Sequence, residues 1–445
     1  MQNTYVTHVD KMINEGMSLA RLGQGIPIMV PFGVKDDVLE VKITKRKKDY
    51  WIGSISKVIT PSPMRAKPQC PYFGICGGCQ WQMVDYKYQP LLKKELVEDT
   101  LSHLAGIKEI DVLDTIPSPK PLNYRNKVHF PLKRVSSSSV IMGFYKQDTH
   151  YIIDVDECPL HLTQFNEVFK KAKRYIGEKG LSIYDETKHT GFIRNFTLRG
   201  SEKMQETLIV IVSRGNYLHK GTAMDLMKMG STIQGVVENV NPEKGNTIFG
   251  EESRTLLGAN LFHERVRNYT FVISATSFFQ INTLIAEKMV EVFDKILQDI
   301  GEVDVIVDSY SGVGLFAVAS AKYARKVYAL EISKESVSCA TKNIAINNKP
   351  NVEIINGDAE ELLQSFGKVD VLILDPPRRG VGDGVINFLN NSKPLHILYF
   401  SCNPATLARD LKEIVGAGYE IEFVQPFDMF PQTYHVESLT YFRRK

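Results

Sequence analysis

The chain has 445 residues, more than one compact domain usually holds, so we expect about two to four domains, each with its own core. Its formal net charge of +3 excludes a strongly basic or acidic binding protein, and any nucleic-acid contact must come from local clusters. The sequence has neither a run of about 18 apolar residues nor a leader pattern, so we expect a soluble, cytoplasmic protein with no membrane partner.

Residues 1–58 alternate short β-prone runs with turn signals, which predicts a small all-β module. This stretch contains basic residues followed by two aromatic ones: Lys42, Lys45, Arg46, Lys47, Lys48, Tyr50 and Trp51. Positive charge beside aromatic rings suits RNA binding, and a solvated β-turn accounts for the same residues equally well. Pro61, Pro63 and Pro68 then indicate a linker, since proline resists continued strand or helix.

Residues 59–270 mix helical and strand signals, which predicts an α+β domain. Apolar residues recur at helical spacing over 89–103, and strand-like runs follow at 128–133, 141–145, 192–199, 206–213 and 235–240. The serines at 136–139 predict a flexible loop tip. Basic clusters at 124–127 and 170–174 fit either RNA contact or solvated surface.

Four cysteines of this region are candidates for one metal site: Cys70, Cys76, Cys79 and Cys158. Three of them crowd within ten positions, which in a large intracellular protein indicates a metal or cluster more than disulfides. Four thiolates bind either zinc or a [4Fe–4S] cluster, and spacing alone does not separate the two.

Residues 271–445 alternate between helix and strand. Helices are predicted at 283–298, 315–324 and 334–347, and strands at 303–308, 326–332, 352–356, 369–375 and 396–400. This alternation predicts right-handed βαβ units, a parallel sheet and a Rossmann-like doubly wound fold. The runs 423–427 and 439–442 predict an antiparallel hairpin at one edge.

A cofactor site is indicated by the glycine-rich turn Asp308–Gly314, which closes the first of these strands, and by Glu331 at the end of the second. A carboxylate there can accept hydrogen bonds from both ribose hydroxyls. The sequence lacks the three-glycine dinucleotide fingerprint and the phosphate loop, so an adenosyl ligand without phosphates, S-adenosylmethionine, fits better. Asp358 is a candidate for contacting the adenine, and Asp375 for the reacting centre. Helix N-capping is the alternative role for each acid.

A candidate nucleophile occurs in Ser401-Cys402-Asn403-Pro404, directly after the apolar run 396–400. The carboxyl ends of strands in open α/β sheets point into the ligand crevice, so Cys402 is suited to covalent chemistry. A buried, inert thiol is the alternative for an isolated cysteine. Cys339 lies at helical spacing within 334–347 and is predicted to be core.

Four segments together closely resemble the S-adenosylmethionine-dependent RNA 5-methyluridine methyltransferases: Asp308–Gly314, Asp375-Pro376-Pro377-Arg378, Ser401–Pro404 and His435-Val436-Glu437-Ser438. Upstream, Cys70-x5-Cys76-Gly-Gly-Cys79 with Cys158-Pro159 resembles the iron–sulfur motif of the ribosomal RNA branch. Residues 1–58 resemble its RNA-binding TRAM domain. The resemblance implies a multi-domain α/β protein: an OB-like barrel (1–58), a central α+β domain with the cysteine cluster and an RNA-binding surface (59–270), and a Rossmann-like class I methyltransferase domain (271–445).

The same resemblance implies roles for individual residues. Cys402 is implied as the nucleophile that adds to uracil C6, and Glu437 as the acceptor of the C5 proton. Implied cofactor contacts are Gln280, Tyr310, Glu331 and Asp375, with Asp358 a looser assignment. Gln280 or the flank of Arg378 is a candidate donor to uracil O4. A [4Fe–4S] cluster with a structural or RNA-positioning role is implied on the four cysteines, in preference to zinc.

The implied substrate is a uridine of 23S rRNA, which must be flipped out of any stack before Cys402 reaches C6. Methylation of the tRNA T-loop is the second enzymatic interpretation. An RNA-binding or RNA-folding factor with an idle site is the interpretation from another class. A small-molecule or DNA cytosine methyltransferase would leave the N-terminal barrel without an evident use.

Overall fold

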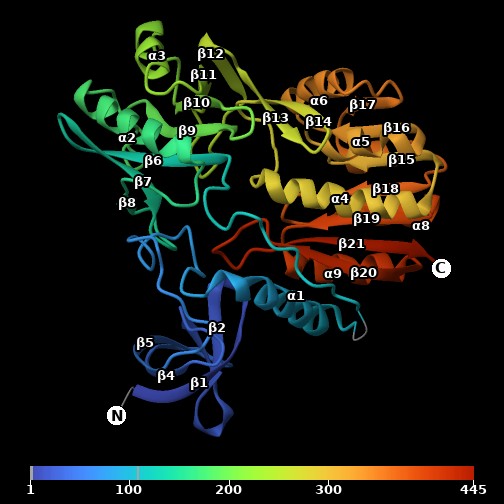
Figure 1. Ribbon diagram of the computed structural model, residues 1–445, viewed down its shortest axis with the longest axis horizontal. Helices are drawn as coiled ribbons and strands as arrows, with labels where there is room; N and C mark the ends of the chain where they lie inside the picture. Colours follow the sequence, from blue (N-terminus) through green and yellow to red (C-terminus); the bar gives the residue numbers. More distant parts are fainter. Residues whose placement is uncertain (1–3, 108–109) are drawn as a thin grey trace.

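The structure is a computed structural model that describes residues 4–107 and 110–445 (Figure 1). A closed barrel, a seven-stranded mixed sheet and a second seven-stranded sheet follow one another along the chain. The expected multi-domain α/β organisation is therefore confirmed, whereas the boundaries at 58 and 270 stay predictions. Within these two ranges no helix is both long and apolar enough to cross a membrane.

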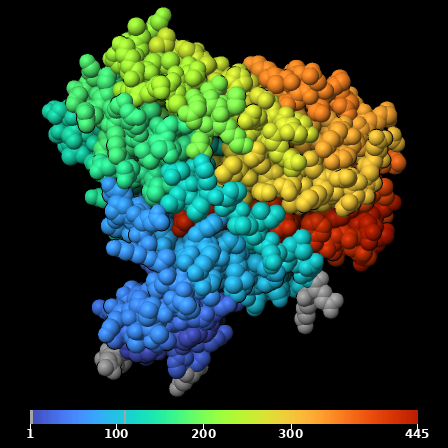
Figure 2. Space-filling view, viewed as in Figure 1, coloured from blue at the N-terminus to red at the C-terminus, as the bar shows by residue number. Residues whose placement is uncertain are grey.

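The N-terminal barrel closes in the strand order β1-β2-β3-β5-β4. Its strands are β1 (Thr4–Met12), β2 (Met17–Arg21), β3 (Pro27–Pro31), β4 (Val38–Arg46) and β5 (Trp51–Thr60). Alternate side chains point inward, so Val9, Ala20, Ile28, Val30 and Val41 fill the interior. The barrel, which projects from the rest of the molecule (Figure 2), confirms the expected small all-β module.

Helix α1 (Gln89–Ala105) follows the cysteine-rich loop and a short turn, η3 (Tyr86–Tyr88). It does not join the central sheet. Its apolar face, which includes Leu92, Leu96 and Leu101, packs with α9 (Pro404–Gly416) and β20 (Tyr419–Phe427) of the C-terminal region. Figure 1 shows α1 beneath the last strands of the chain. An upstream helix therefore covers part of the downstream sheet.

The central sheet has the order β12-β11-β10-β9-β6-β7-β8. Its strands are β6 (Lys127–Ser136), β7 (Ser139–Tyr145), β8 (Ile152–Asp154), β9 (Ile193–Ser201), β10 (Glu206–Ser213), β11 (Ile233–Val240) and β12 (Glu252–Gly258). Helices α2 (Thr163–Glu178) and α3 (Lys220–Met227) share a core with one face. The α+β expectation is confirmed. The serines at 136–139 form the tip of the hairpin between β6 and β7, where Ser136 pairs with Ser139, and the flexibility of this tip stays a prediction.

The C-terminal sheet has the order β17-β16-β15-β18-β19-β21-β20. A hairpin, β13 (Leu261–Val266) and β14 (Tyr269–Ser274), precedes it. Besides β20, the strands of the C-terminal sheet are β15 (Val303–Ser309), β16 (Ala324–Glu331), β17 (Val352–Asn356), β18 (Val371–Leu374), β19 (His396–Ser401) and β21 (Glu437–Arg444). Strands β15 to β19 are parallel, and β21 is antiparallel to both β19 and β20. The Rossmann-like fold and the edge hairpin are confirmed.

Helices cover both faces of this sheet. One core joins α4 (Thr283–Ile300), α5 (Leu315–Ser320) and α6 (Lys334–Ile346) to the sheet, and includes Cys339 as expected. The other joins α1, α7 (Ala359–Leu363), α8 (Asp383–Ser392) and α9. Because both faces are buried, the open edge at the strands' carboxyl ends is where a ligand can approach.

Candidate active site

Cys402 and Glu437 lie at the same edge of the C-terminal sheet. Cys402 follows β19, and Glu437 begins β21, whose antiparallel course pairs Ser438 with Ser401. Glu437 is buried, with 4% of its surface exposed, and Cys402 is partly buried. Burial and then the charge of Glu437 raise the pKa of the Cys402 thiol to about 11, while Arg378 lowers it.

Asp375 and Gln280 join this pair. Asp375 follows β18, the parallel neighbour of β19, and Gln280 precedes α4. The Gln280 amide donates a hydrogen bond from Nε2 to Asp375 Oδ2 at 3.4 Å. Burial raises the pKa of Asp375 to about 7. Burial and then Asp375 also raise the pKa of Glu437 well above its ordinary value.

The glycine-rich turn after β15 is held by Glu331. Gly312 and Gly314 adopt positive φ angles of 55° and 86°, which glycine accepts without a steric penalty. Glu331 Oε2 accepts a hydrogen bond from the Gly312 amide at 2.8 Å, and its Oε1 accepts one from the Ser333 amide at 2.7 Å. Each carboxylate oxygen retains a further lone pair for a ligand hydroxyl.

Buried polar atoms without partners gather at this turn. In the described part of the chain, neither carboxylate oxygen of Asp308 has a hydrogen-bond partner, nor do Ser309 Oγ and Ser311 Oγ. Burial and then Asp375 raise the pKa of Asp308. Buried polar groups are normally paired, so this set is suited to a polar ligand in the crevice.

Tyr310 and Asp358 lie beside the same turn. The Tyr310 hydroxyl donates to Glu360 Oε1 at 3.4 Å. Asp358 caps α7, since its Oδ1 accepts from the amides of Glu360 and Glu361 at 2.9 and 3.3 Å, which matches the N-cap alternative. Glu360 also accepts from the amides of Gly382 and Gly384, a role that no pattern in the sequence indicates.

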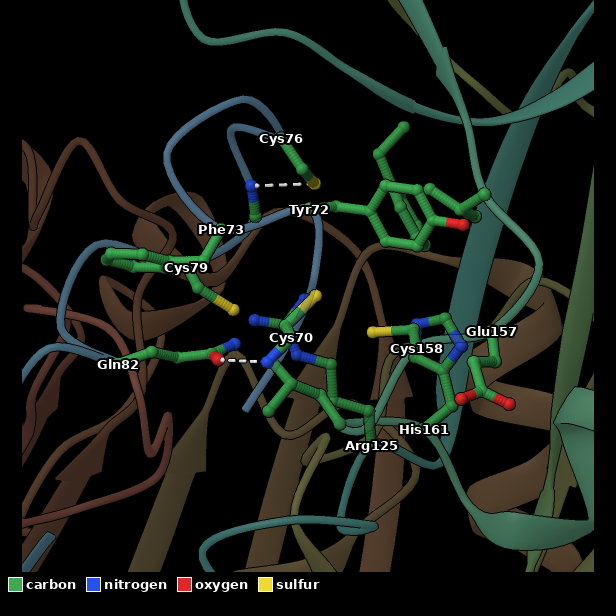
Figure 3. A pocket seen from close by; sticks show the side chains of 14 residues that line it. Cys70, Tyr72, Phe73, Cys76, Cys79, Gln82, Arg125, Glu157, Cys158 and His161 are labelled. Atoms are coloured by element: carbon green, nitrogen blue, oxygen red, sulfur yellow. Dashed lines mark hydrogen bonds between the residues drawn. The ribbon is translucent and has the colours of Figure 1, made fainter. Parts of the chain in front are cut away.

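The four candidate metal-binding cysteines surround one cavity of about 30 Å³, as Figure 3 shows. Their pKa values are all raised, chiefly by burial, with Cys79 reaching about 11 and Cys158 about 12. Over residues 4–107 and 110–445, no group of three or more histidine, cysteine, aspartate or glutamate side chains is placed closely enough to hold a metal ion.

Arg125 lines the cysteine cavity (Figure 3). It forms no ion pair with any carboxylate of the described chain, and its Nε donates to the Tyr124 hydroxyl at 3.4 Å. Tyr124 and Asn126 are buried, and Asn126 donates to the Gln280 carbonyl at 2.9 Å. The expectation of a surface cluster at 124–127 is therefore wrong for Tyr124 and Asn126, which pack inside.

Two surfaces are open to a large substrate. A hollow of about 670 Å³ adjoins the site and is lined in part by Gln80, Tyr145, His150, Arg378, Tyr434 and His435. On the barrel, the basic residues after Lys42 are exposed, and the Arg46 guanidinium lies 4.5 Å from the centre of the Trp51 ring.

Comparisons with known proteins agree with this geometry. The family model described as tRNA (uracil-5-)-methyltransferase matches residues 259–445. An uncharacterized RNA methyltransferase of Gloeobacter violaceus is 36% identical over 96% of this chain and 94% of its own. Another from Halalkalibacterium halodurans is 34% identical over 97% and 95%.

A solved structure covers nearly the whole molecule. The tRNA (uracil-54, C5)-methyltransferase of Pyrococcus abyssi, in complex with S-adenosyl-L-homocysteine, superposes with a TM-score of 0.75 at 28% identity. The match covers 98% of this chain and 99% of that one. This structure and the two relatives each match nearly the whole chain. The protein therefore belongs to the RNA 5-methyluridine methyltransferase family.

Proposed function

We propose that this protein transfers a methyl group from S-adenosylmethionine to C5 of a uridine in RNA, through a covalent adduct between Cys402 and uracil C6. The observation that carries the proposal is the convergence of Cys402, Glu437 and Asp375 at one sheet edge, beside a turn with unpaired buried polar atoms.

The need for Cys402 follows from the chemistry of uracil. C5 is too weak a nucleophile to take a methyl group directly, and addition of a thiolate to C6 converts the ring into an enolate whose C5 is nucleophilic. Negative charge then develops on O4. Gln280 and Arg378 remain our candidates for stabilising it, since an amide and a guanidinium are both hydrogen-bond donors.

Glu437 is proposed as the base that completes the reaction. After methylation, C5 carries both a methyl group and a proton, and the Cys402 sulfur leaves C6 only when that proton is removed. The C5–H electron pair then re-forms the C5–C6 double bond. The raised pKa of Glu437 supports this role, because a base whose pKa lies closer to the working pH binds a proton more readily.

The turn residues fit S-adenosylmethionine, which supplies an electrophilic methyl group on a sulfonium. Glu331 would accept hydrogen bonds from the ribose hydroxyls, and the turn at Gly312 and Gly314 lets the ligand approach the backbone. The unpaired oxygens of Asp308 offer acceptors nearby. Asp375, with Gln280, would face the reacting centre.

The cysteine cavity fits an anionic group. Four free thiols face one another there, and Arg125 brings a cation that no carboxylate of the described residues neutralises. A [4Fe–4S] cluster bound by four thiolates is negatively charged, so Arg125 would compensate it. We propose this cluster on Cys70, Cys76, Cys79 and Cys158 as a structural group, since methyl transfer requires no electron.

We propose 23S rRNA as the substrate, because the spacing of Cys70, Cys76, Cys79 and Cys158 resembles that of the ribosomal RNA branch. The second candidate is the tRNA T-loop. It is favoured by the matching family model and by the Pyrococcus abyssi structure, both of which are named for tRNA methylation. Exposed basic residues beside Trp51 support RNA binding in either case.

Tritium release from RNA carrying [5-³H]uridine tests the proposal. Anaerobically purified protein receives S-adenosylmethionine and either ribosomal or tRNA transcripts, with Cys402→Ala as the control. We expect release from ribosomal fragments that requires both the cofactor and Cys402. Release from tRNA alone would promote the second candidate. If both RNAs bind and neither loses tritium, the protein is an RNA-binding factor and the proposal fails.

A further inference from the structure

The turn that leads into Glu437, residues 428–436, is clamped by one lysine of α1. Lys93 Nζ donates to Asp428 Oδ1 at 2.5 Å, to the Phe430 carbonyl at 3.0 Å and to the His435 carbonyl at 2.7 Å. His435 is two residues before Glu437. A single side chain therefore fixes both ends of this turn, which we call the base turn.

Gln89 anchors the middle of the base turn. Its Oε1 accepts from the Gln432 amide at 2.9 Å, and its Nε2 donates to Gln432 Oε1 at 3.1 Å. The same Nε2 donates to the carbonyls of Trp81 and Val84, at the end of the cysteine-rich loop. The amides of Gln80 and Trp81 in turn donate to the Gln432 carbonyl at 3.2 and 3.0 Å.

These anchors are buried. Gln89, Lys93 and Asp428 have no exposed surface, and the Tyr86 hydroxyl completes the network by donating to Asp428 Oδ2 at 2.8 Å. Buried polar groups without partners are costly, so such a network strongly favours the one arrangement in which every member is satisfied. The base turn thus takes its position from α1 and the cysteine-rich loop, outside the methyltransferase sheet.

We propose that Lys93 and Gln89 are positioning residues that hold Glu437 in reach of the C5 proton. The proposal rests on the function proposed above. Proton transfer requires hydrogen-bond contact between base and carbon acid, and a displacement of about 1 Å can slow a reaction on the order of a hundredfold. Loosening the base turn then slows proton removal after methyl transfer, so the methylated adduct on Cys402 accumulates.

The variants are chosen so that no buried charge is left alone. Lys93→Met with Asp428→Asn removes the cation and the anion together, since Lys93→Met alone would strand a buried carboxylate. Gln89→Met removes the second anchor at similar volume. Lys94→Met is the matched control, because Lys94 is the next residue of α1 and pairs with Asp114 at the surface.

We expect kcat to fall on the order of ten- to a hundredfold in the double variant and in Gln89→Met, while KM for RNA changes less than about threefold. Denaturing gels should reveal covalent RNA–protein adduct in both. If both variants turn over at the wild-type rate, or if KM rises without adduct, the positioning role is overturned. If the double variant does not melt cooperatively, Gln89→Met decides.

The wild type and Lys94→Met separate this proposal from the one it rests on. If they transfer methyl groups at the same rate, the variants test positioning alone. If neither methylates RNA nor forms an adduct, the proposed function fails and the positioning role fails with it.

Discussion

Cys402 is a thiol whose surroundings oppose its ionisation. Burial and then Glu437 raise its pKa to about 11, Arg378 lowers it, and Asp375 raises it further. Below the pKa, the thiolate fraction grows about tenfold for each unit of pH. We therefore expect alkylation of Cys402 by iodoacetamide to accelerate steadily between about pH 7 and pH 9.

Two variants should change the alkylation rate of Cys402 in opposite directions. Glu437→Gln removes a charge that raises the Cys402 pKa and should speed alkylation, whereas Arg378→Gln removes one that lowers it and should slow alkylation. Mass spectrometry of the Cys402 peptide measures both rates. Cys339, which is buried in α6, serves as the reference thiol. Equal rates at Cys402 in all three proteins would contradict the assignment of these charges.

At the scale of elements, the turn between β15 and α5 depends on glycine. Gly314 has φ of 86°, and an added Cβ would meet only ordinary contact with Ala340 Cβ at 3.6 Å. The cost of Gly314→Ala is therefore backbone strain, about 1–2 kcal/mol in the free energy of unfolding. Urea denaturation measures it.

Gly416→Ala is the control for this substitution. Gly416 ends α9 without a positive φ, and no atom lies within 4 Å of its added Cβ. Gly416→Ala should leave the free energy of unfolding unchanged or raise it by up to about 1 kcal/mol. Equal stability of the two variants would show that the turn after β15 tolerates a side chain.

Elements with strong local patterns could be predicted from the sequence. The strand expected at 352–356 is β17, and the helical spacing of 89–103 gives α1. The helix expected at 315–324 ends at Ser320 because Ala321–Tyr323 tighten into a 3-10 turn. Strand β2 was not predicted, because its five residues form too short a pattern. Helix α2 was not predicted, although Phe165, Val168 and Ala172 lie at helical spacing. The basic residues at 170–174 were interpreted only as a charged surface, and the apolar residues between them were not taken as one face of a helix.

The candidate site was predictable where strand ends define it. Cys402 and Asp375 each follow a parallel strand and Glu331 ends one, and the carboxyl ends of such strands meet at one edge. The contact of Lys93 with Asp428 was not, because 335 residues separate the two and no local pattern encodes such a pair. For the same reason, neither residue was singled out from the sequence.

At the scale of the whole molecule, the cysteine cavity joins segments from far along the chain. Cys79 lies in the loop before α1, and Cys158 precedes α2 beside the central sheet. A group bound by both would cross-link these segments. We expect Cys79→Ala to lose iron and to melt at a lower temperature, since metal binding stabilises only the folded state.

Iron analysis, visible absorbance and thermal melting of anaerobically prepared protein measure these effects. Cys339→Ala is the control. Because Cys339 belongs to a separate core, this variant should keep the iron. If the wild type contains zinc instead of iron, the cross-link between the two segments is retained, and the bound group is zinc and not an iron–sulfur cluster. Full iron content in Cys79→Ala would remove this cysteine from the ligand set.

The packing of α1 on the C-terminal sheet also limits how such a protein can exchange parts during evolution. A recombination point between residues 106 and 271 would separate Lys93 from Asp428 and leave a buried carboxylate without its cation. A methyltransferase sheet acquired by a new protein must therefore bring α1 with it, or lose Asp428 first. The packing of α1 on the C-terminal sheet, more than adjacency in the chain, therefore determines which segments of this protein depend on one another.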